Sequence, residues 1–235
     1  MKVVGVISSP HGDGNGAILV REALGAARTA GAEVGEIFLS DYRIEFCRAC
    51  DACLKSGVCP IPDDFERVKA ALQEADGIIL STPTYGGAAS ARIKNLLDRL
   101  GQLAFLTSFL GGKYVAGIAT ASSFGLKPTI AQLTAAARGS VFRRAQVSGT
   151  LAVALHGRHV RAIPEALKKA GKLGARIAED IRCRRRYPLQ NLGFRILNTL
   201  LMKPMLRRGI VRHRDRGLQA AYAELVRKGL LTPAG

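Results

Sequence analysis

Apolar residues along this chain fall into short runs that are separated by stretches of helical periodicity. Runs bounded by glycines or polar residues cover positions 3–8, 32–39, 77–82 and 113–120. Such runs are typical of parallel strands that are buried on both faces of a sheet. A fifth run, at 141–147, alternates a charged residue with apolar neighbours, which predicts a strand at the edge of the sheet.

The stretches between these runs have the period of amphipathic helices. Asp63 is expected to be the N-cap of one helix, with Glu66 as its capping-box partner, and Pro164 to stand in the first turn of another. The predicted helices cover residues 14–30, 63–75, 88–107, about 128–138 and 164–182.

Strand and helix alternate five times along the chain. This alternation indicates an α/β fold, with a doubly wound, five-stranded parallel sheet that carries helices on both faces. In sheets of this kind the ligand lies outside the carboxyl ends of the strands. Candidate chemistry is therefore expected in four loops, at residues 9–16, 40–62, 83–88 and 121–127.

The composition is that of a protein with an aliphatic core. Its 235 residues are 48% hydrophobic and include no Trp, which suits one large domain or a domain with an appendage. The N-terminal apolar run is too short for a signal peptide, and the most apolar stretch, 103–118, is interrupted by Gly111, Gly112 and Lys113. The expected location is therefore the cytoplasm, where thiols remain available for a metal.

Much of the net charge of +17 lies near the end of the chain. Thirteen Lys and Arg residues against two acids follow position 181, which gives this segment a charge of +11. Apolar stripes accompany the charge, one at Phe194, Leu197, Leu201 and Met205, and one at Leu218, Tyr222, Leu225 and Val226.

Three interpretations of this basic segment stay open. It could pack on the domain or on a second copy in a dimer or tetramer, lie on a membrane surface as a basic amphipathic helix, or dock an acidic redox partner by electrostatic steering. Nucleic acid is a disfavoured partner, because no recognition module and no stacking aromatic residues accompany the charge.

Four of the five cysteines fall within thirteen residues, at Cys47, Cys50, Cys53 and Cys59. Four thiolates are the usual ligands of an iron–sulfur cluster, and such runs often end in Cys-Pro, as this one does. One four-iron four-sulfur cluster is therefore predicted. Structural zinc usually takes two Cys pairs with a longer spacer, disulfides fit poorly without a secretory context, and inert cysteines are the remaining alternative.

The loop between the first strand and the first helix is rich in glycine. It reads Ser-Ser-Pro-His-Gly-Asp-Gly-Asn-Gly over residues 8–16. Backbone N–H groups at a helix N-terminus form an anion site, and glycines allow a phosphate to approach closely. A dinucleotide fingerprint is rejected, because the first Gly does not directly follow the strand and no acid closes the second strand. The alternative is an ordinary turn that binds nothing.

The loop after the third strand reads Ser-Thr-Pro-Thr-Tyr-Gly-Gly-Ala over residues 81–88. Tyr85 offers a stacking surface, while Gly86 and Gly87 allow backbone amides to reach a planar ligand. Since this loop leaves the carboxyl end of a buried strand, it is predicted to bind a ligand.

In combination, the Ser-Pro loop, the Pro-x-Tyr-Gly loop and the cysteine run followed by Asp-Asp resemble the iron–sulfur flavoproteins of the NAD(P)H-dependent FMN reductase group. The resemblance covers about residues 1–180. It implies a flavodoxin-like, FMN-binding domain at 1–182 with a cysteine-rich loop at 43–62. The change in composition and charge after this domain predicts a basic helical C-terminal extension at 183–235. NAD(P)H would be a candidate electron donor.

The resemblance also implies which residues hold the cofactors. The FMN phosphate would be held by Ser9, His11, Asn15, Gly16 and Ala17. The flavin ring would lie against Pro83, Thr84, Tyr85, Gly86 and Gly87, and be edged by Ala121, Ser122, Ser123 and Phe124. The cluster ligands would be Cys47, Cys50, Cys53 and Cys59. Two positions depart from the family's pattern, since His11 replaces the usual Arg or Lys and Gly16 replaces the usual Thr.

The leading hypothesis is an FMN-dependent electron-transfer oxidoreductase, in which a cluster next to the flavin couples two-electron and one-electron carriers. Its partner would be NAD(P)H or a redox protein. One alternative is an NAD(P)H-dependent FMN or quinone reductase without a functional cluster. Another is an FMN-binding regulatory or scaffold protein that acts through its basic tail. No catalytic acid or base is assigned: Lys94 and Asp98 are expected to form an ion pair, and His156 and His159 to be surface residues.

Overall fold

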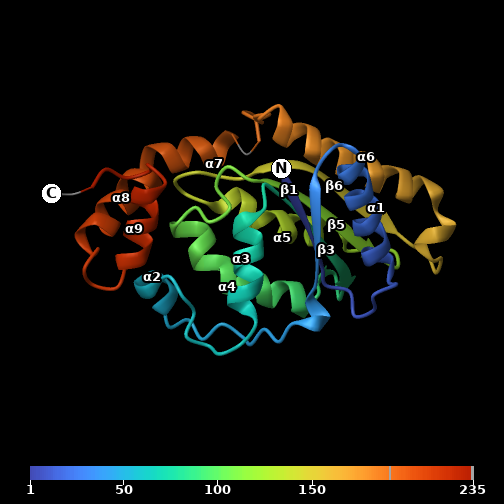
Figure 1. Ribbon diagram of the computed structural model, residues 1–235, viewed down its shortest axis with the longest axis horizontal. Coiled ribbons are helices and arrows are strands. Elements are labelled where there is room, and N and C mark those ends of the chain that lie inside the picture. Colours follow the sequence, from blue (N-terminus) through green and yellow to red (C-terminus); the bar gives the residue numbers. More distant parts are fainter. Residues whose placement is uncertain (191, 234–235) are drawn as a thin grey trace.

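A parallel sheet forms the centre of the molecule (Figure 1). In the computed structural model, which describes residues 1–190 and 192–233, the strand order is β2-β1-β3-β5-β6. Neighbouring strands on this path pair in parallel. The strands are β1 (Lys2–Ile7), β2 (Glu33–Phe38), β3 (Gly77–Tyr85), β5 (Tyr114–Ala121) and β6 (Gln146–Ala154).

Helices cover both faces of the sheet, so the predicted doubly wound architecture is confirmed (Figure 1). Helices α1 (Asn15–Thr29) and α6 (Pro164–Arg182) pack on one face in a first aliphatic core. On the other face, a second core includes side chains of α3 (Phe65–Glu74), α4 (Ala91–Leu106) and α5 (Leu126–Gly139). Because helices bury both faces of the sheet, both sets of strand side chains are apolar, which explains the continuous apolar runs in the sequence.

The end of β3 differs from the prediction. This strand continues to Tyr85 instead of ending at 82, and it turns back into the two-residue strand β4 (Ala88–Ala89). The following helix α4 therefore begins at Ala91 and not at 88. A glycine pair that was expected to open a helix is in fact the turn of a hairpin.

The predicted edge strand at 141–147 is wrong. The edge strand β6 is Gln146–Ala154. Val141 and Phe142, whose spacing around Arg143 suggested a strand, are buried in a third apolar cluster with the C-terminal helices. These two consecutive residues are apolar because they pack against the extension, and not because they face the sheet.

The predicted capping box at Asp63 is confirmed only in part. Asp63 Oδ1 accepts from the Phe65 N–H at 3.0 Å, but the Asp63 N–H donates to the Ile61 carbonyl and not to Glu66. Helix α3 begins at Phe65 with Asp64 as its N-cap. The Glu66 carboxylate accepts a hydrogen bond from the Cys59 N–H at 2.9 Å. Asp63 also makes an ion pair with a distant helix, which is described below.

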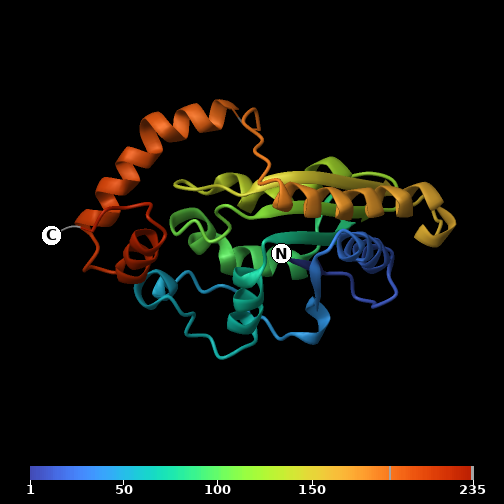
Figure 2. The ribbon, with the colours of Figure 1, turned by 45° about the horizontal axis from the view of Figure 1, so that its top comes forward.

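The C-terminal extension leaves the end of α6, arches away from the sheet and returns to the domain (Figure 2). Its last helix, α9, lies beside the short helix α2 (Ala52–Ser56) of the cysteine loop. The Lys228 ammonium donates to the carbonyls of Thr107 and Ser108, each at 3.0 Å. The helices of the arch are α7 (Leu192–Leu197), the π-helical turn η3 (Asn198–Met202), α8 (Lys203–Arg212) and α9 (Gln219–Arg227).

The two apolar stripes of the extension have different surroundings. Leu225 is fully buried in the third cluster, so the second stripe packs on the domain. The first stripe is exposed at Leu197, Leu201 and Met205. The buried residue on this part of the arch is Asn198, which faces inward. None of the helices in the described part of the chain is long and apolar enough to cross a bilayer.

Candidate functional site

The carboxyl ends of three neighbouring strands bring the predicted binding loops to one edge of the sheet. In the strand order, β1, β3 and β5 are consecutive, and all run in the same direction. The Ser8 N–H donates to the Ser81 carbonyl at 3.2 Å, which ties the loop after β1 to the end of β3. This placement of the loops follows the sequence prediction.

Helix α1 begins in a way that leaves its first N–H groups free. Gly14 is the N-cap residue, no side chain caps the helix, and no acid stands in its first turn. Within the described residues, the N–H groups of Asn15, Gly16 and Ala17 have no hydrogen-bond acceptor. Unpaired amides at a helix N-terminus attract an anion, so this end of α1 fits a phosphate group.

The side chains of the same loop maintain its shape. Ser9 Oγ donates to the His11 carbonyl at 3.0 Å, and the Gly14 N–H donates to that carbonyl at 3.1 Å. Asn15 Oδ1 accepts from the Val160 N–H at 2.7 Å, which anchors the segment after β6. The His11 side chain is exposed. The donors that the fold itself positions for an anion are therefore backbone amides.

Gly86 and Gly87 form the turn of the hairpin between β3 and β4. Their φ angles are 56° and 79°, and a type I′ turn needs positive φ at both central residues. Tyr85, just before the turn, is 57% exposed. Thr84 Oγ1 donates to Thr129 Oγ1 at 3.1 Å, which holds the hairpin against α5. The turn thus presents an aromatic ring and backbone amides on a firmly held support.

The loop after β5 touches this hairpin. A Cβ placed on Gly125 would lie 2.7 Å from Gly87 Cα, which shows how closely the two backbones approach. Ala121 is buried at the end of β5, whereas Ser122 and Ser123 are exposed. The residues predicted to surround a flavin ring therefore come together at one edge, and their contacts with FMN stay a prediction.

The cysteine run lies on an irregular loop that follows β2. Positive φ angles at Ala49, Asp51 and Gly57 bend its backbone around helix α2. Ser40 Oγ donates to the Ser9 carbonyl at 3.4 Å, so the loop starts beside the phosphate loop. It then leaves the flavin edge and runs toward the C-terminal extension (Figure 1).

The four thiols of this loop are free and differ in exposure. Cys47 and Cys50 are exposed, while Cys53 and Cys59 are half-buried against the second core. Across residues 1–190 and 192–233, no three His, Cys, Asp or Glu side chains are arranged so that they could hold a metal ion. The predicted ligands are therefore in one loop but have not converged.

Three of the thiols nevertheless share one electrostatic environment. Burial raises the pKa of Cys53, and the neighbouring Cys59 and Cys47 raise that pKa further. Thiolates that repel one another are a donor set that a cationic metal centre can neutralise. The chemistry of the donors fits an iron–sulfur cluster, although the present arrangement of the sulfur atoms does not.

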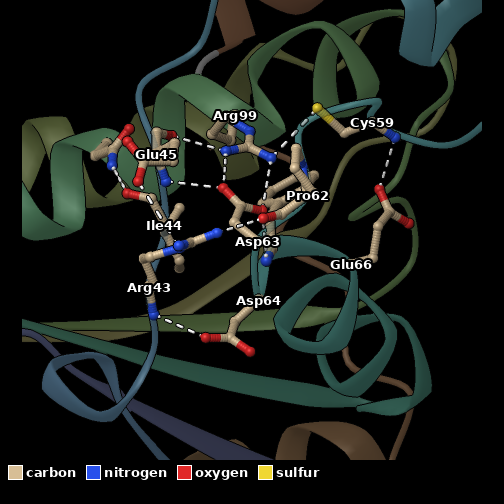
Figure 3. A network of polar contacts seen from close by, with 11 residues as sticks. Arg43, Ile44, Glu45, Cys59, Pro62, Asp63, Asp64, Glu66 and Arg99 are labelled. Atoms are coloured by element: carbon tan, nitrogen blue, oxygen red, sulfur yellow. Dashed lines mark hydrogen bonds and ion pairs between the residues drawn. The ribbon is translucent and has the colours of Figure 1, made fainter.

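A buried ion pair lies directly behind Cys59 (Figure 3). The side chains of Arg99 and Asp63 are 1% and 0% exposed, and Arg99 Nη1 lies 2.6 Å from Asp63 Oδ2. Arg99 Nη2 donates to Cys59 Sγ at 3.2 Å, and Arg99 Nη1 donates to the Glu45 carbonyl at 2.7 Å. One guanidinium thus connects α4, both ends of the cysteine loop and one of the thiols.

The charges of this pair are mutually stabilising. Burial acts to raise the pKa of Asp63, but hydrogen bonds from Arg99 and from the Glu45 and Phe65 amides outweigh it, so the pKa lies below its ordinary value. Burial acts to lower the pKa of Arg99, but Asp63 and Cys59 outweigh it and the pKa is raised. A permanent positive charge therefore stands 3.2 Å from the Cys59 sulfur.

Helix α4 links this pair to the flavin edge. Its N-cap, Ser90, follows the hairpin directly, and Arg99 stands nine residues further along the helix. At a rise of 1.5 Å per residue the two points are about 14 Å apart along the helix axis. Helix α4 therefore separates the cysteine loop from the predicted flavin site by this distance, and the two are not in direct contact along it.

Sequence reasoning did not single out Arg99. Its position in the sequence could have indicated its role, because Arg99 lies on the buried side of α4 among the apolar residues Leu96, Leu100 and Leu103. A charged residue on an apolar helix face indicates a buried partner, because an unpaired charge there is costly. The other polar predictions are confirmed. Lys94 and Asp98 form an exposed ion pair at 2.5 Å, and two histidines, His156 and His159, are exposed.

Comparisons with known proteins agree with this arrangement of loops. The sequence profile of the family described as NADPH-dependent FMN reductase matches residues 1–159. An iron–sulfur flavoprotein of Methanocaldococcus jannaschii is 40% identical over 136 residues, which are 57% of this chain and 69% of that protein. An iron–sulfur flavoprotein of Archaeoglobus fulgidus is 31% identical over 184 residues, covering 76% and 80% of the two chains.

The fold has a counterpart among solved structures. A flavodoxin from the domain Archaea superposes with a TM-score of 0.52 at 15% identity, covering 77% of this chain and 99% of that one. At this identity the likeness concerns the fold alone. The part that lies outside the family match begins at residue 160 and includes the whole C-terminal extension.

Proposed function

This chain belongs to the NADPH-dependent FMN reductase family and is a flavin-dependent oxidoreductase, and we propose that it carries electrons between a two-electron donor and one-electron carriers through FMN and an iron–sulfur cluster. The donor would be NAD(P)H, and the acceptor a redox protein. We also propose that it works in the cytoplasm.

FMN, when bound, accepts electrons as a pair and can release them singly. The residues of this chain would supply position and electrostatics. The free amides of Asn15, Gly16 and Ala17 at the start of α1 would hold the phosphate. The hairpin at Gly86 and Gly87 and the loop after β5 would bring backbone N–H groups to the ring, where such donors stabilise developing negative charge.

A cluster held by Cys47, Cys50, Cys53 and Cys59 would exchange one electron at a time. The single observation that supports this part best is the hydrogen bond from buried Arg99 to Cys59 Sγ at 3.2 Å. A guanidinium that is fixed by a buried carboxylate and directed at a sulfur atom suits a thiolate ligand. The printed names of the two archaeal relatives support the same proposal.

The test begins with protein that is purified without oxygen. The proposal predicts flavin absorbance with a broad shoulder near about 400 nm and about four iron atoms per FMN. NADPH should bleach the flavin, and a one-electron acceptor should restore it. Flavin without iron would leave a plain FMN or quinone reductase. Failure to oxidise NADPH or NADH with any acceptor would favour a regulatory protein that acts through its tail.

A second arm separates the cluster from the flavin. A variant with all four loop cysteines changed to Ser should keep FMN and its reduction by NADPH. It should lose the iron, and its transfer to a one-electron acceptor should slow more than its transfer to a two-electron quinone. Equal slowing of both reactions would show that the cysteines do not serve one-electron transfer.

The binding partner of the C-terminal extension stays a prediction. The exposed stripe at Leu197, Leu201 and Met205 is compatible with a dimer or tetramer, with a membrane surface or with a redox partner. Sedimentation of the purified protein over a range of concentrations would decide whether copies of this chain associate.

A further inference from the structure

A cavity lies at the opposite edge of the sheet from the flavin loops. It has a volume of about 1150 Å³ and is lined by Met1, Asp76, Tyr114 and Gln146, which stand at or just before the first residues of four strands. Its other wall is formed by residues of the C-terminal extension, including Asn198 and Lys203. Domain and extension therefore enclose it jointly, and its size is that of a small-molecule site.

The wall of this cavity is strongly positive. Nine of its described lining residues are Lys or Arg, and one, Asp76, is acidic. That carboxylate is already engaged, because it accepts from the Lys2 N–H at 2.8 Å and lies 3.8 Å from the N-terminal ammonium. Two of the cations are paired with acids of α6, Arg182 with Glu179 at 2.5 Å and Arg185 with Asp180 at 3.2 Å. The remaining cations repel one another, and an anion in the cavity would reduce that repulsion.

Some of these cations have no counter-charge. The half-buried Arg144 guanidinium has neither a hydrogen bond nor an ion pair with any described residue. Burial lowers the pKa of Arg144, and the neighbouring Arg195 lowers it further. Among the described residues, Arg195 itself donates only to the Pro188 carbonyl. An Arg held in this way is suited to a phosphate, which accepts two hydrogen bonds from one guanidinium.

The wall also contains an orphaned acceptor. Asn198 is 6% exposed, and its Nδ2 donates to the Val141 carbonyl at 2.7 Å. Its Oδ1 is buried and has no hydrogen-bond partner within the described part of the chain. A buried polar atom without a partner is costly, and a hydroxyl group of a ligand would satisfy it. The cavity thus combines cations for phosphate groups with an acceptor for a hydroxyl.

We propose that this cavity is a binding site for a nucleotide, whose phosphates pair with Arg144, Arg195 and Lys203 and whose sugar hydroxyl donates to Asn198 Oδ1. The site is separate from the proposed flavin site, because the eight residues of β5 separate the two edges by about 26 Å. A nucleotide bound here acts as a ligand that ties the extension to the domain, and it does not react with the flavin.

The test uses the full chain with FMN bound, titrated calorimetrically with ADP and with inorganic pyrophosphate at 0.15 M salt. ADP should bind in a saturable manner without displacing FMN, and more tightly than pyrophosphate. Arg144→Gln should lower the affinity for both ligands at least tenfold. Asn198→Ala should lower the affinity for ADP to that for pyrophosphate, and the affinity for pyrophosphate should not change.

Arg28→Gln is the matched control, because it removes the same charge from the exposed end of α1 and should leave both affinities unchanged. Lys203→Gln, at an exposed position of the cavity wall, replaces Arg144→Gln if that variant does not fold. The proposal is overturned if ADP does not saturate, if Arg144→Gln and Lys203→Gln bind ADP like the wild type, or if pyrophosphate binds as tightly as ADP. None of these readouts depends on iron or on NADPH oxidation, so the proposed function stands or falls separately.

Discussion

The phosphate loop and the cysteine loop leave neighbouring strands at the same edge of the sheet, but the fold completes only the first. The amides of Asn15, Gly16 and Ala17 point along α1 because the helix itself orients them, and no ligand is needed to place them. The four thiols are side chains on a bent loop, two of them exposed, and they form no metal-binding group among the described residues.

The difference separates two ways of making a binding site. Backbone donors at a helix end are a by-product of folding, so the proposed FMN phosphate site needs no ligand to form. Thiolates repel one another, and a metal centre must offset that repulsion before they can converge. What the fold supplies in advance is the anchor, the Asp63–Arg99 pair that fixes the base of the loop and one thiol.

The largest expected effect sharpens this contrast at the cysteines. Cys59→Ser should abolish iron binding, because Cys59 is the thiol that the buried Arg99 contacts, and it should leave FMN content unchanged. The measurement is iron and FMN per chain after anaerobic reconstitution. Cys183→Ser is the control, since Cys183 is an exposed thiol at the end of α6, outside the loop, and it should keep full iron. Loss of FMN along with iron in Cys59→Ser would show that the two loops are not independent.

The second effect concerns the anchor. Arg99→Met leaves the Asp63 carboxylate buried without its counter-charge, and breaking a buried pair in this way costs about 3–5 kcal/mol. Urea unfolding of the iron-free protein measures it. Lys94→Met breaks an exposed pair on the same helix and should cost about 0–1 kcal/mol. Equal costs would show that the Asp63–Arg99 pair does not fix the loop.

The same anchor has a pH signature. The pKa of Asp63 is lowered in the folded protein, so its contribution to stability is complete above the unfolded value of about 3.9 and is lost as pH falls through the lower folded value. The free energy of unfolding of the wild type should therefore exceed that of Arg99→Met by a constant amount near neutral pH. This difference in stability should become smaller below about pH 4. A difference that stays constant in acid would mean that Asp63 is not the group concerned.

Sequence reasoning was most reliable where one local rule decides the outcome. The parallel strands, the loops at their carboxyl ends and helix α6, which spans Pro164–Arg182 as predicted, follow from apolar runs and from a proline in a first turn. These features depend on neighbours in the chain, so the sequence displays them directly.

Its errors share a different cause. The segment 141–147 was interpreted as a strand because Arg143 stands among apolar residues, and only the distant extension explains why Val141 and Phe142 are buried. Asp63 does accept a hydrogen bond at the start of α3, but its ion pair with Arg99, 36 residues away, was missed. The thiols were recognised as a set, but the positions proposed for them around a cluster are not those that the fold gives the described residues. Long-range partners and ligands therefore limit what local pattern can predict.

The third effect concerns how the hairpin is placed. Gly125→Ala would bring a Cβ to 2.7 Å from Gly87 Cα and 2.9 Å from Thr84 Cγ2, which should displace the hairpin and weaken FMN at least tenfold, or about 1.4 kcal/mol. Gly157→Ala is the matched control, because its φ of 76° is similar to the 82° of Gly125 and nothing lies within 4 Å of the new Cβ. Flavin fluorescence titration gives both affinities. Equal weakening would assign the effect to backbone strain alone.

The smallest effect tests whether the phosphate loop is as complete as its amides suggest. His11→Lys places a permanent charge at an exposed position of that loop, and charges at a helix N-terminus change anion binding by about 0.3–1 kcal/mol. FMN should therefore bind about two- to fivefold more tightly at low salt, and the gain should shrink at 0.5 M salt. Thr29→Lys adds a charge at the far end of the same helix and should leave FMN affinity unchanged. An unchanged affinity in His11→Lys at low salt would mean that the backbone amides alone already neutralise the phosphate, and the contrast with the cysteine loop would then be sharper still.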